Sequence, residues 1–160
     1  MRYQLNVVAR SVSDVVQHAG GLVYDRVMAG WDVTVILTDS CDTRPVEILG
    51  ADVADLEKAL TSEGLGRHPQ ALAIAADLFM SDDRVQGGVV RALASGNVEV
   101  SFWGESWPLD SDDRAASVVH QLSFAAKAFK SHALIAAAIS SGSAGAAEVF
   151  HSSRAPVPAA

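Results

Sequence analysis

The chain has 160 residues, of which 49% are hydrophobic and 19% charged, and a formal net charge of −7. A chain of this size commonly folds as one compact domain, and this composition excludes an intrinsically disordered protein. The negative charge opposes binding to nucleic acid or to an anionic membrane, because no run of basic residues offsets it. We therefore expect an acidic globular protein that binds neither.

Cysteine content and the N-terminal sequence indicate the cellular compartment of the protein. Cys41 is the only cysteine, so neither an internal disulfide nor a cysteine-rich zinc site can form. The N-terminus lacks the basic stretch and following apolar run of a secretory signal. These features predict a cytoplasmic protein.

Residues 3–38 show the pattern of one strand, helix and strand unit. Residues 3–8 alternate as a first strand, and Ser11 with Asp14 has the spacing of a capping box at a helix start. The β-branched run at 33–37 predicts a second strand that helices cover on both faces. A parallel pair of strands is the expected product of this unit.

Small residues mark the helix of this unit. Gly20 and Gly21 each weaken a helix by about 1 kcal/mol relative to alanine, which implies close backbone packing or a helix break. Gly30 ends the helix. The run Ala19-Gly20-Gly21 and the later run at 29–35 resemble the opening unit of many Rossmann-like proteins, including nucleotide-sugar glycosyltransferases. This resemblance implies a Rossmann-like fold and transfers no catalytic residue, and the chain has no room for the second domain of those transferases.

The rest of the chain continues the alternation of strands and helices. The linker before 45–49 is too short for a parallel crossover, so that run predicts an antiparallel edge strand. In chain order, the later predictions are a helix at 52–60, a flexible stretch at 61–69, a strand or helix start at 71–76 with strand preferred, a helix that begins at 81–83 and ends at Gly96, a strand at 98–103 and a long helix at 112–139. The order predicts one α/β domain at 1–139, a three-layer Rossmann-like fold with a mainly parallel sheet of about five strands, and a flexible or docking C-terminal tail at 140–160.

Polar residues follow several of the predicted strands, at the edge where open α/β sheets bind ligands. The candidate ligand-binding residues are Arg10, Ser11, Asp39, Asp77 and Glu105. Arg10 and Ser11 lie where a helix N-terminus directs free amides, and such ends bind anions. The carboxylates could hold Mg²⁺ or act as acid and base, although turn formation and helix capping are commoner roles for aspartate.

Motifs of cofactor and metal sites are missing. Neither G-x-G-x-x-G nor G-x-x-x-x-G-K-[ST] occurs, and Cys41 has no base nearby in the sequence. The histidines are too dispersed for a helix-borne metal pair and fit packing or surface positions, with His18 and His120 expected on or beside helices. We predict no cofactor and no metal.

The string Trp103-Gly104-Glu105-Ser106-Trp107-Pro108 follows the strand predicted at 98–103. Indole rings supply much of the energy of protein interfaces, so Trp103 and Trp107 are candidate interface residues. The alternative is that both rings close the end of the sheet.

No complete catalytic set is visible in the sequence. The main expectation is therefore a non-catalytic binding or interaction module that forms a homodimer or other homo-oligomer, or binds a protein partner. The alternative is a small enzyme or ligand-binding protein for an anionic metabolite at the carboxyl-end rim of the sheet. A third interpretation is an inactive relative of a nucleotide-binding domain.

Overall fold

The computed structural model describes residues 3–39, 42–61, 69–104, 116–139 and 145–152. Within these ranges the strands are β1 (Gln4–Ala9), β2 (Asp32–Leu37), β3 (Asp52–Asp55), β4 (Ala71–Ala75), β5 (Glu99–Trp103), β6 (Ala116–Gln121) and β7 (Ala147–Ser152). The helices are α1 (Val12–Met28), α2 (Arg44–Ile48), α3 (Leu56–Thr61), α4 (Ala76–Ser81), α5 (Asp83–Ser95) and α6 (Phe124–Ala136). No helix in the described ranges is both long enough and apolar enough to cross a membrane.

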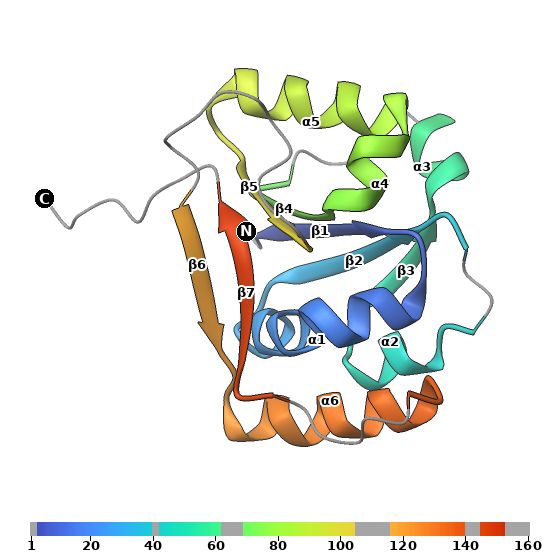
Figure 1. The fold of residues 1–160 in the computed structure, drawn as a ribbon, viewed down its shortest axis with the longest axis vertical. Helices are drawn as coiled ribbons and strands as arrows, with labels where there is room; N and C mark the ends of the chain where they lie inside the picture. The colour runs from blue at the N-terminus through green and yellow to red at the C-terminus, as the bar shows by residue number, and fades with distance from the viewer. Residues whose placement is uncertain (1–2, 40–41, 62–68, 105–115, 140–144, 153–160) are drawn as a thin grey trace, which may run out of the picture.

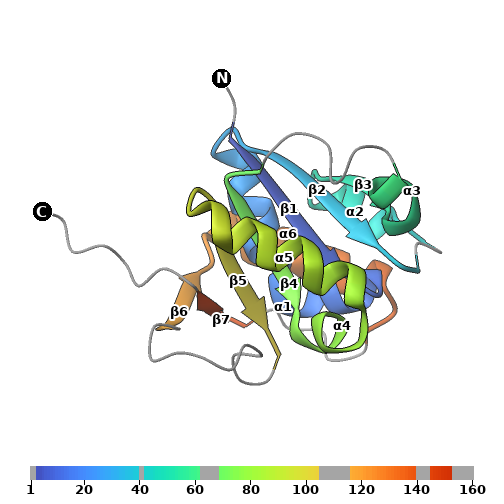
Figure 2. The same ribbon diagram turned by 90° about the horizontal axis from the view of Figure 1, so that it is seen from above.

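One seven-stranded sheet forms the centre of the molecule, in the order β3-β2-β1-β4-β5-β7-β6. The strands from β3 to β5 pair in parallel, whereas β7 pairs antiparallel with both β5 and β6. Figure 1 shows α3, α4 and α5 on one face of the sheet, with α1, α2 and α6 on the other. In Figure 2, β6 and β7 lie at the end of the sheet opposite β3. The mainly parallel, layered α/β prediction is confirmed, but the sheet has seven strands in place of about five.

The chain folds locally as its first unit predicts. β1 and β2 pair in register from Gln4 and Asp32 onward, with α1 between them in sequence. Ser11 caps α1 by accepting a hydrogen bond from the Asp14 amide at 3.3 Å, and Gly30 follows the helix at φ 93°. Nearly all residues of β1 and most of β2 are buried between the helix layers, which is why both strands are rich in apolar residues.

Two predictions in the region after β2 are wrong. Residues 45–49, expected as an edge strand, lie mainly in helix α2, because Pro45 occupies the first helical turn and Val46 and Leu49 bury the same side of it. The helix predicted at 52–60 begins instead as strand β3, which pairs with β2, and the helix α3 follows. The carboxylate of Asp55 accepts the Glu57 amide at 2.8 Å and so marks the change from strand to helix.

Two further corrections concern the last third of the chain. The long helix predicted at 112–139 contains strand β6 and then helix α6, separated because Ser123 caps α6 through the Ala126 amide at 3.0 Å. His120 therefore lies in a strand. Residues 140–160 are not wholly a loose tail, because Phe150 and Ser152 of β7 are buried between β5 and β6. Strand β7 becomes ordered by pairing on both sides.

A buried ion pair joins α1, α6 and β7. The Nζ atom of Lys130 lies 2.7 Å from Oε2 of Glu148, and the two side chains are only 5% and 1% exposed. Glu148 also accepts the amides of Gly21 and Leu22, both at 2.7 Å, while Lys130 donates to the Gln17 carbonyl at 2.8 Å. These two side chains therefore satisfy each other and bind the backbone in the middle of α1.

The glycines of α1 make this close approach possible. A Cβ atom on Gly21 would lie 2.3 Å from Cγ of Leu122, and one on Gly20 would lie 3.4 Å from Cγ of Lys130. At a distance below 3 Å something must shift, so a side chain at Gly21 would displace Leu122. The close packing inferred from the Gly20-Gly21 pair is thus confirmed.

Candidate functional site

The carboxyl ends of the parallel strands meet at one edge of the sheet, and polar residues line it. We use the name rim for Arg10, Ser11, Asp39 and Asp77, which follow β1, β2 and β4. The carbonyl of Arg10 accepts the Asp39 amide at 2.8 Å and the Thr38 hydroxyl at 3.2 Å. The loops after β1 and β2 are therefore joined by main-chain contact.

The side chain of Arg10 turns toward helix α4, which follows β4. Its guanidinium donates to the Ser81 hydroxyl, and its Nε atom lies 3.8 Å from Oδ2 of Asp77. The side chains of Arg10 and Asp77 are 49% and 70% exposed, so this ion pair contributes little stability and its guanidinium can exchange partners with a ligand. The structure thus brings together two residues that the sequence placed on one rim.

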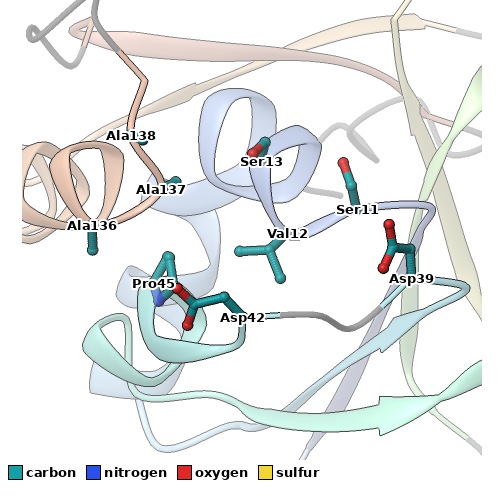
Figure 3. A pocket seen from close by; sticks show the side chains of 9 residues that line it. All are labelled: Ser11, Val12, Ser13, Asp39, Asp42, Pro45, Ala136, Ala137 and Ala138. Atoms are coloured by element: carbon teal, nitrogen blue, oxygen red, sulfur yellow. The ribbon is translucent and has the colours of Figure 1, made fainter.

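A pocket of about 280 Å³ opens beside the first turn of α1 (Figure 3). It lies among the loop after β2, the start of α2 and the end of α6. Its lining consists of two serines, two aspartates and small apolar residues, namely Ser11, Val12, Ser13, Asp39, Asp42, Pro45, Ala136, Ala137 and Ala138. The volume is just below the usual range of about 300–1,000 Å³ for small-molecule sites, which suits a small metabolite.

The two aspartates of the pocket supply hydrogen-bond acceptors. In Figure 3, Asp39 lies beside Ser11, and Asp42 lies beside Pro45. Asp42 accepts the Arg44 amide at 3.1 Å and binds the Arg44 guanidinium at 3.0 Å. The hydrogen bond from the Arg44 side chain lowers the pKa of Asp42, so this group stays ionised and serves better as an acceptor than as a base.

Ala138, in the pocket wall, has a left-handed backbone conformation with φ 59°. It follows the end of α6, where the Ile139 amide bonds to the Leu134 carbonyl at 3.0 Å in a Schellman motif. Glycine normally occupies this position, as Gly30, Gly50 and Gly96 do after α1, α2 and α5. An alanine here costs about 1 kcal/mol, and strain of this kind is often found at ligand sites.

A carboxylate and histidine pair lies on α1 near the end of β5. The Nδ1 atom of His18 is 2.9 Å from Oδ1 of Asp14, one helical turn earlier, and the indole Nε1 of Trp103 donates to the same oxygen at 3.2 Å. The hydrogen bond to Asp14 raises the pKa of His18 and outweighs burial and the charge of Lys130, which lower it. Sequence reasoning missed this pair, although the spacing D-x-x-x-H was available as a signal.

A second pair of this kind lies toward the C-terminal end of α1, away from the rim. His120 Nε2 is 2.9 Å from Oδ2 of Asp25, and the Ser123 hydroxyl donates to Oδ1 at 2.6 Å. Burial raises the pKa of Asp25, but the hydrogen bonds from Ser123 and His120 outweigh it and hold that pKa below its usual value. Ser123 and His120 both contact Asp25 and not each other in this arrangement, so it does not form a nucleophilic triad. It ties α1 to the β6–α6 turn.

The remaining predicted residues have different outcomes. Trp103 is only 2% exposed and belongs to the core, so its assignment as an interface residue is wrong and the alternative, closure of the sheet end, holds for it. Its burial follows from its place on β5, between β4 and β7 in the sheet, and from its contact with the Phe150 ring. Glu105 and Trp107 lie outside the described residues.

Comparison with known proteins identifies the fold. No protein-family model and no curated protein sequence matches the chain. Several solved structures align over almost the whole chain. The zinc-inhibited form of the teicoplanin deacetylase Orf2 has a TM-score of 0.63 at 11% identity, covering 97% of this chain and 100% of its own. The A40926 pseudoaglycone deacetylase Dbv21 has a TM-score of 0.64 at 10% identity, covering 93% and 96%.

A third is GalB, the 4-carboxy-2-hydroxymuconate hydratase from Pseudomonas putida KT2440, with a TM-score of 0.62 at 14% identity, covering 98% of each chain. The chain has the fold of these α/β enzymes. Identities this low establish the fold alone. Because these neighbours are enzymes, they overturn the main expectation of a non-catalytic interaction module and favour the alternative, a small enzyme or ligand-binding protein.

Zinc is named for the Orf2 structure, so the donor groups of this chain matter. Within the part of the chain that the structure describes, no three His, Cys, Asp or Glu side chains are grouped to hold a metal ion. Arg10 and Ser11 at the head of α1 are not metal ligands of the usual kind. The described residues therefore do not fit a metal centre, and no metal-dependent step is assigned to this chain.

Proposed function

We propose that the protein is a small enzyme that binds an anionic metabolite at the rim and adds water to it. The observation that carries this proposal is the exposed guanidinium of Arg10 at the junction of three strand ends, in the residue that precedes Ser11 of the pocket lining. Open α/β sheets bind ligands at this edge. The enzymes that share the fold support catalysis as the use of such a site.

The charges define the kind of ligand. Arg10 can bind a carboxylate or phosphate, and the first-turn amides of α1 favour the same negative group. Asp39 and Asp42 line the pocket with acceptors that suit hydroxyl or amino groups of the ligand. The wall at Ala136–Ala138 leaves room for a small apolar substituent. A small acid or phosphate with several hydroxyl groups fits these features.

The kind of reaction follows from the neighbouring enzymes. Deacetylation breaks an amide or ester with water, and hydration adds water to a double bond. Both reactions need a group that accepts a proton from water and a site that fixes the substrate. We therefore assign to the protein the class of reactions in which water is a substrate.

Thermal unfolding with and without ligand tests the binding step. Glucose 6-phosphate and gluconate should raise the unfolding temperature, with a stabilisation of about 2.7 kcal/mol at a concentration of 100 Kd, whereas neutral glucose should not. Arg10→Gln should abolish the stabilisation. Arg91→Gln on α5, which also removes one exposed arginine, should keep it. Equal stabilisation of the wild type and Arg10→Gln, or none by either anion, would contradict the proposal.

A further inference from the structure

The geometry points to His18 as the proton acceptor for the water that this enzyme adds, with Asp14 and Trp103 as its positioning residues. This inference rests on the proposed function and names the group that performs its chemical step. Its basis is the linked arrangement of three side chains from two elements, α1 and β5, at the carboxyl edge of the sheet.

The hydrogen bonds fix the tautomer of the ring. An ionised carboxylate can only accept hydrogen bonds, so the Nδ1 atom of His18 carries a proton and points it at Asp14, 2.9 Å away. The neutral ring then has its lone pair at Nε2. Within the described residues, no hydrogen-bond partner is present at Nε2, and the His18 side chain is 49% exposed. The basic nitrogen can therefore reach a solvent molecule.

Asp14 is fixed at its main chain and at its carboxylate. The main-chain amide of Asp14 bonds to the Ser11 hydroxyl at 3.3 Å, and its Oδ1 atom accepts the indole of Trp103 at 3.2 Å. Trp103 is itself buried, so its indole is a rigid donor. This chain of contacts connects the histidine to the loop after β1 and to the end of β5. Such support of a base by a fixed carboxylate is the arrangement that general-base catalysis requires.

The groups around His18 act on its pKa in opposite directions. Asp14 is the near negative group and raises the pKa of His18, while the charge of Lys130, across from α6, lowers it. Lys130 is itself paired with Glu148, which limits its effect. A base whose pKa lies close to neutral pH can accept a proton and return it within one catalytic cycle.

The chemical step balances for an acyl substrate. The lone pair of Nε2 takes a proton from water while the water oxygen forms a bond to the acyl carbon, and the carbonyl π pair moves to its oxygen. The tetrahedral intermediate then collapses. The bond to the leaving oxygen or nitrogen breaks, that atom keeps the electron pair, and His18 returns the proton to it. The products are a carboxylic acid and an alcohol or amine, with His18 neutral again.

Hydrolysis of p-nitrophenyl acetate by the full-length chain tests this assignment. His18→Gln should lower kcat/KM about 100-fold, and Asp14→Asn should lower it about 10-fold, since general-base catalysis contributes about 10²–10⁴-fold. His132→Gln removes an exposed histidine of α6 and is the matched control, with no change expected. His18→Asn serves as a second variant if His18→Gln unfolds, which thermal unfolding would reveal.

The pH profile supplies a readout that a merely structural role would not move. The rate should rise with pH as His18 loses its proton, with a midpoint equal to the pKa of His18 measured by NMR. In Asp14→Asn the midpoint of the rate profile and the His18 pKa measured by NMR should both fall, and by the same amount. The inference would be overturned if His18→Gln hydrolysed p-nitrophenyl acetate as fast as the wild type. This holds both when the two rates are high and when neither exceeds uncatalysed hydrolysis.

The two proposals can fail separately. The NMR titration of His18 and the hydrolysis of p-nitrophenyl acetate need no contact with Arg10. Stabilisation by gluconate, in turn, does not involve His18. Stabilisation by gluconate together with turnover that is independent of His18 would overturn the base assignment and leave the rim as a binding site. Hydrolysis that depends on His18 without stabilisation by gluconate would support the base and count against Arg10 as the anion site.

Discussion

Lys130 and Glu148 form a buried ion pair between α1, α6 and β7, whereas Arg10 and Asp77 form an exposed one at the rim. The buried pair has further partners in the backbone of α1, so its charges are fully used in holding three elements together. The Arg10–Asp77 pair is longer, at 3.8 Å, and faces water. The same chemistry thus stabilises the fold in one place and remains available for a ligand in the other.

This contrast follows from solvation. A buried charge that loses its partner cannot recover hydration, and its burial then costs several kcal/mol. An exposed charge that loses its partner is hydrated at once, so the loss is small. Substitutions at the two pairs should therefore differ in their effect on stability and on binding.

The largest expected effect is at the buried pair. Glu148→Gln removes the negative charge beside Lys130 and should lower the free energy of unfolding by about 3–5 kcal/mol, measured by urea denaturation. Asp77→Asn, the matched change at the exposed pair, should stay within about 0.5 kcal/mol of the wild type. Similar losses in both variants would remove the distinction between the two regions.

Gly21→Ala tests the close packing beside the buried pair. The new Cβ would lie 2.3 Å from Leu122, and overpacking of this kind should cost about 1–3 kcal/mol. Gly87→Ala is the control, because no atom lies within 4 Å of its Cβ position in α5, and it should gain about 1 kcal/mol through helix propensity. Chemical denaturation of both variants provides the measurement. A neutral Gly21→Ala would mean that Leu122 can move aside.

Asp25→Asn weakens the second attachment of α1, to His120 and Ser123. The loss should be about 1–2 kcal/mol at pH 7, because hydrogen bonds to a charged acceptor are replaced by weaker ones. The pKa of Asp25 is lowered in the fold, so its stabilisation is complete above the unfolded value of about 3.9 and disappears as the pH falls through the folded value. The unfolding temperatures of the wild type and Asp25→Asn should therefore become equal in acid. A constant difference down to the lowest pH would contradict the role of the charge.

The smallest expected effect concerns the pocket wall. Ala138→Gly relieves the left-handed strain at φ 59° and should raise stability by about 0.5–1 kcal/mol after the entropy cost of glycine. Ala137→Gly, at the C-cap next to it where φ is −84°, should instead lower stability by a similar amount, because glycine adds entropy to the unfolded chain. Calorimetry of both variants makes the comparison. Destabilisation by Ala138→Gly would show that this methyl group packs in the wall.

Local patterns in the sequence predicted β1, α1 and β2 correctly, because alternation, capping and a terminal glycine act within a few residues. The errors at 45–49 and 112–139 arose where tertiary packing decides. Strand β6 has alanine and valine on a stretch that fits a helix equally well, and only its pairing with β7 fixes it as a strand. Strand β7 likewise becomes a strand only between two neighbours.

The candidate site likewise has one part that the sequence predicted and another that depends on tertiary packing. The rule that parallel strands end at one edge placed Arg10 and Asp77 together, and the structure agrees. The spacing of Asp14 and His18 was visible in the sequence, but the contact of Asp14 with Trp103, 89 residues further along the chain, was not. The pocket wall at Ala136–Ala138 required the position of α6, whose start was misassigned.

The contact between Gly21 and Glu148 spans 127 residues of sequence. During synthesis, α1 leaves the ribosome long before β7 does, so the backbone amides at the centre of α1 stay without this acceptor until β7 has emerged. Closing so long a loop is slow, and non-local contacts of this kind reduce folding rates. Strand β7, far along the chain, therefore completes helix α1, which makes the N-terminal half a poor candidate for independent folding.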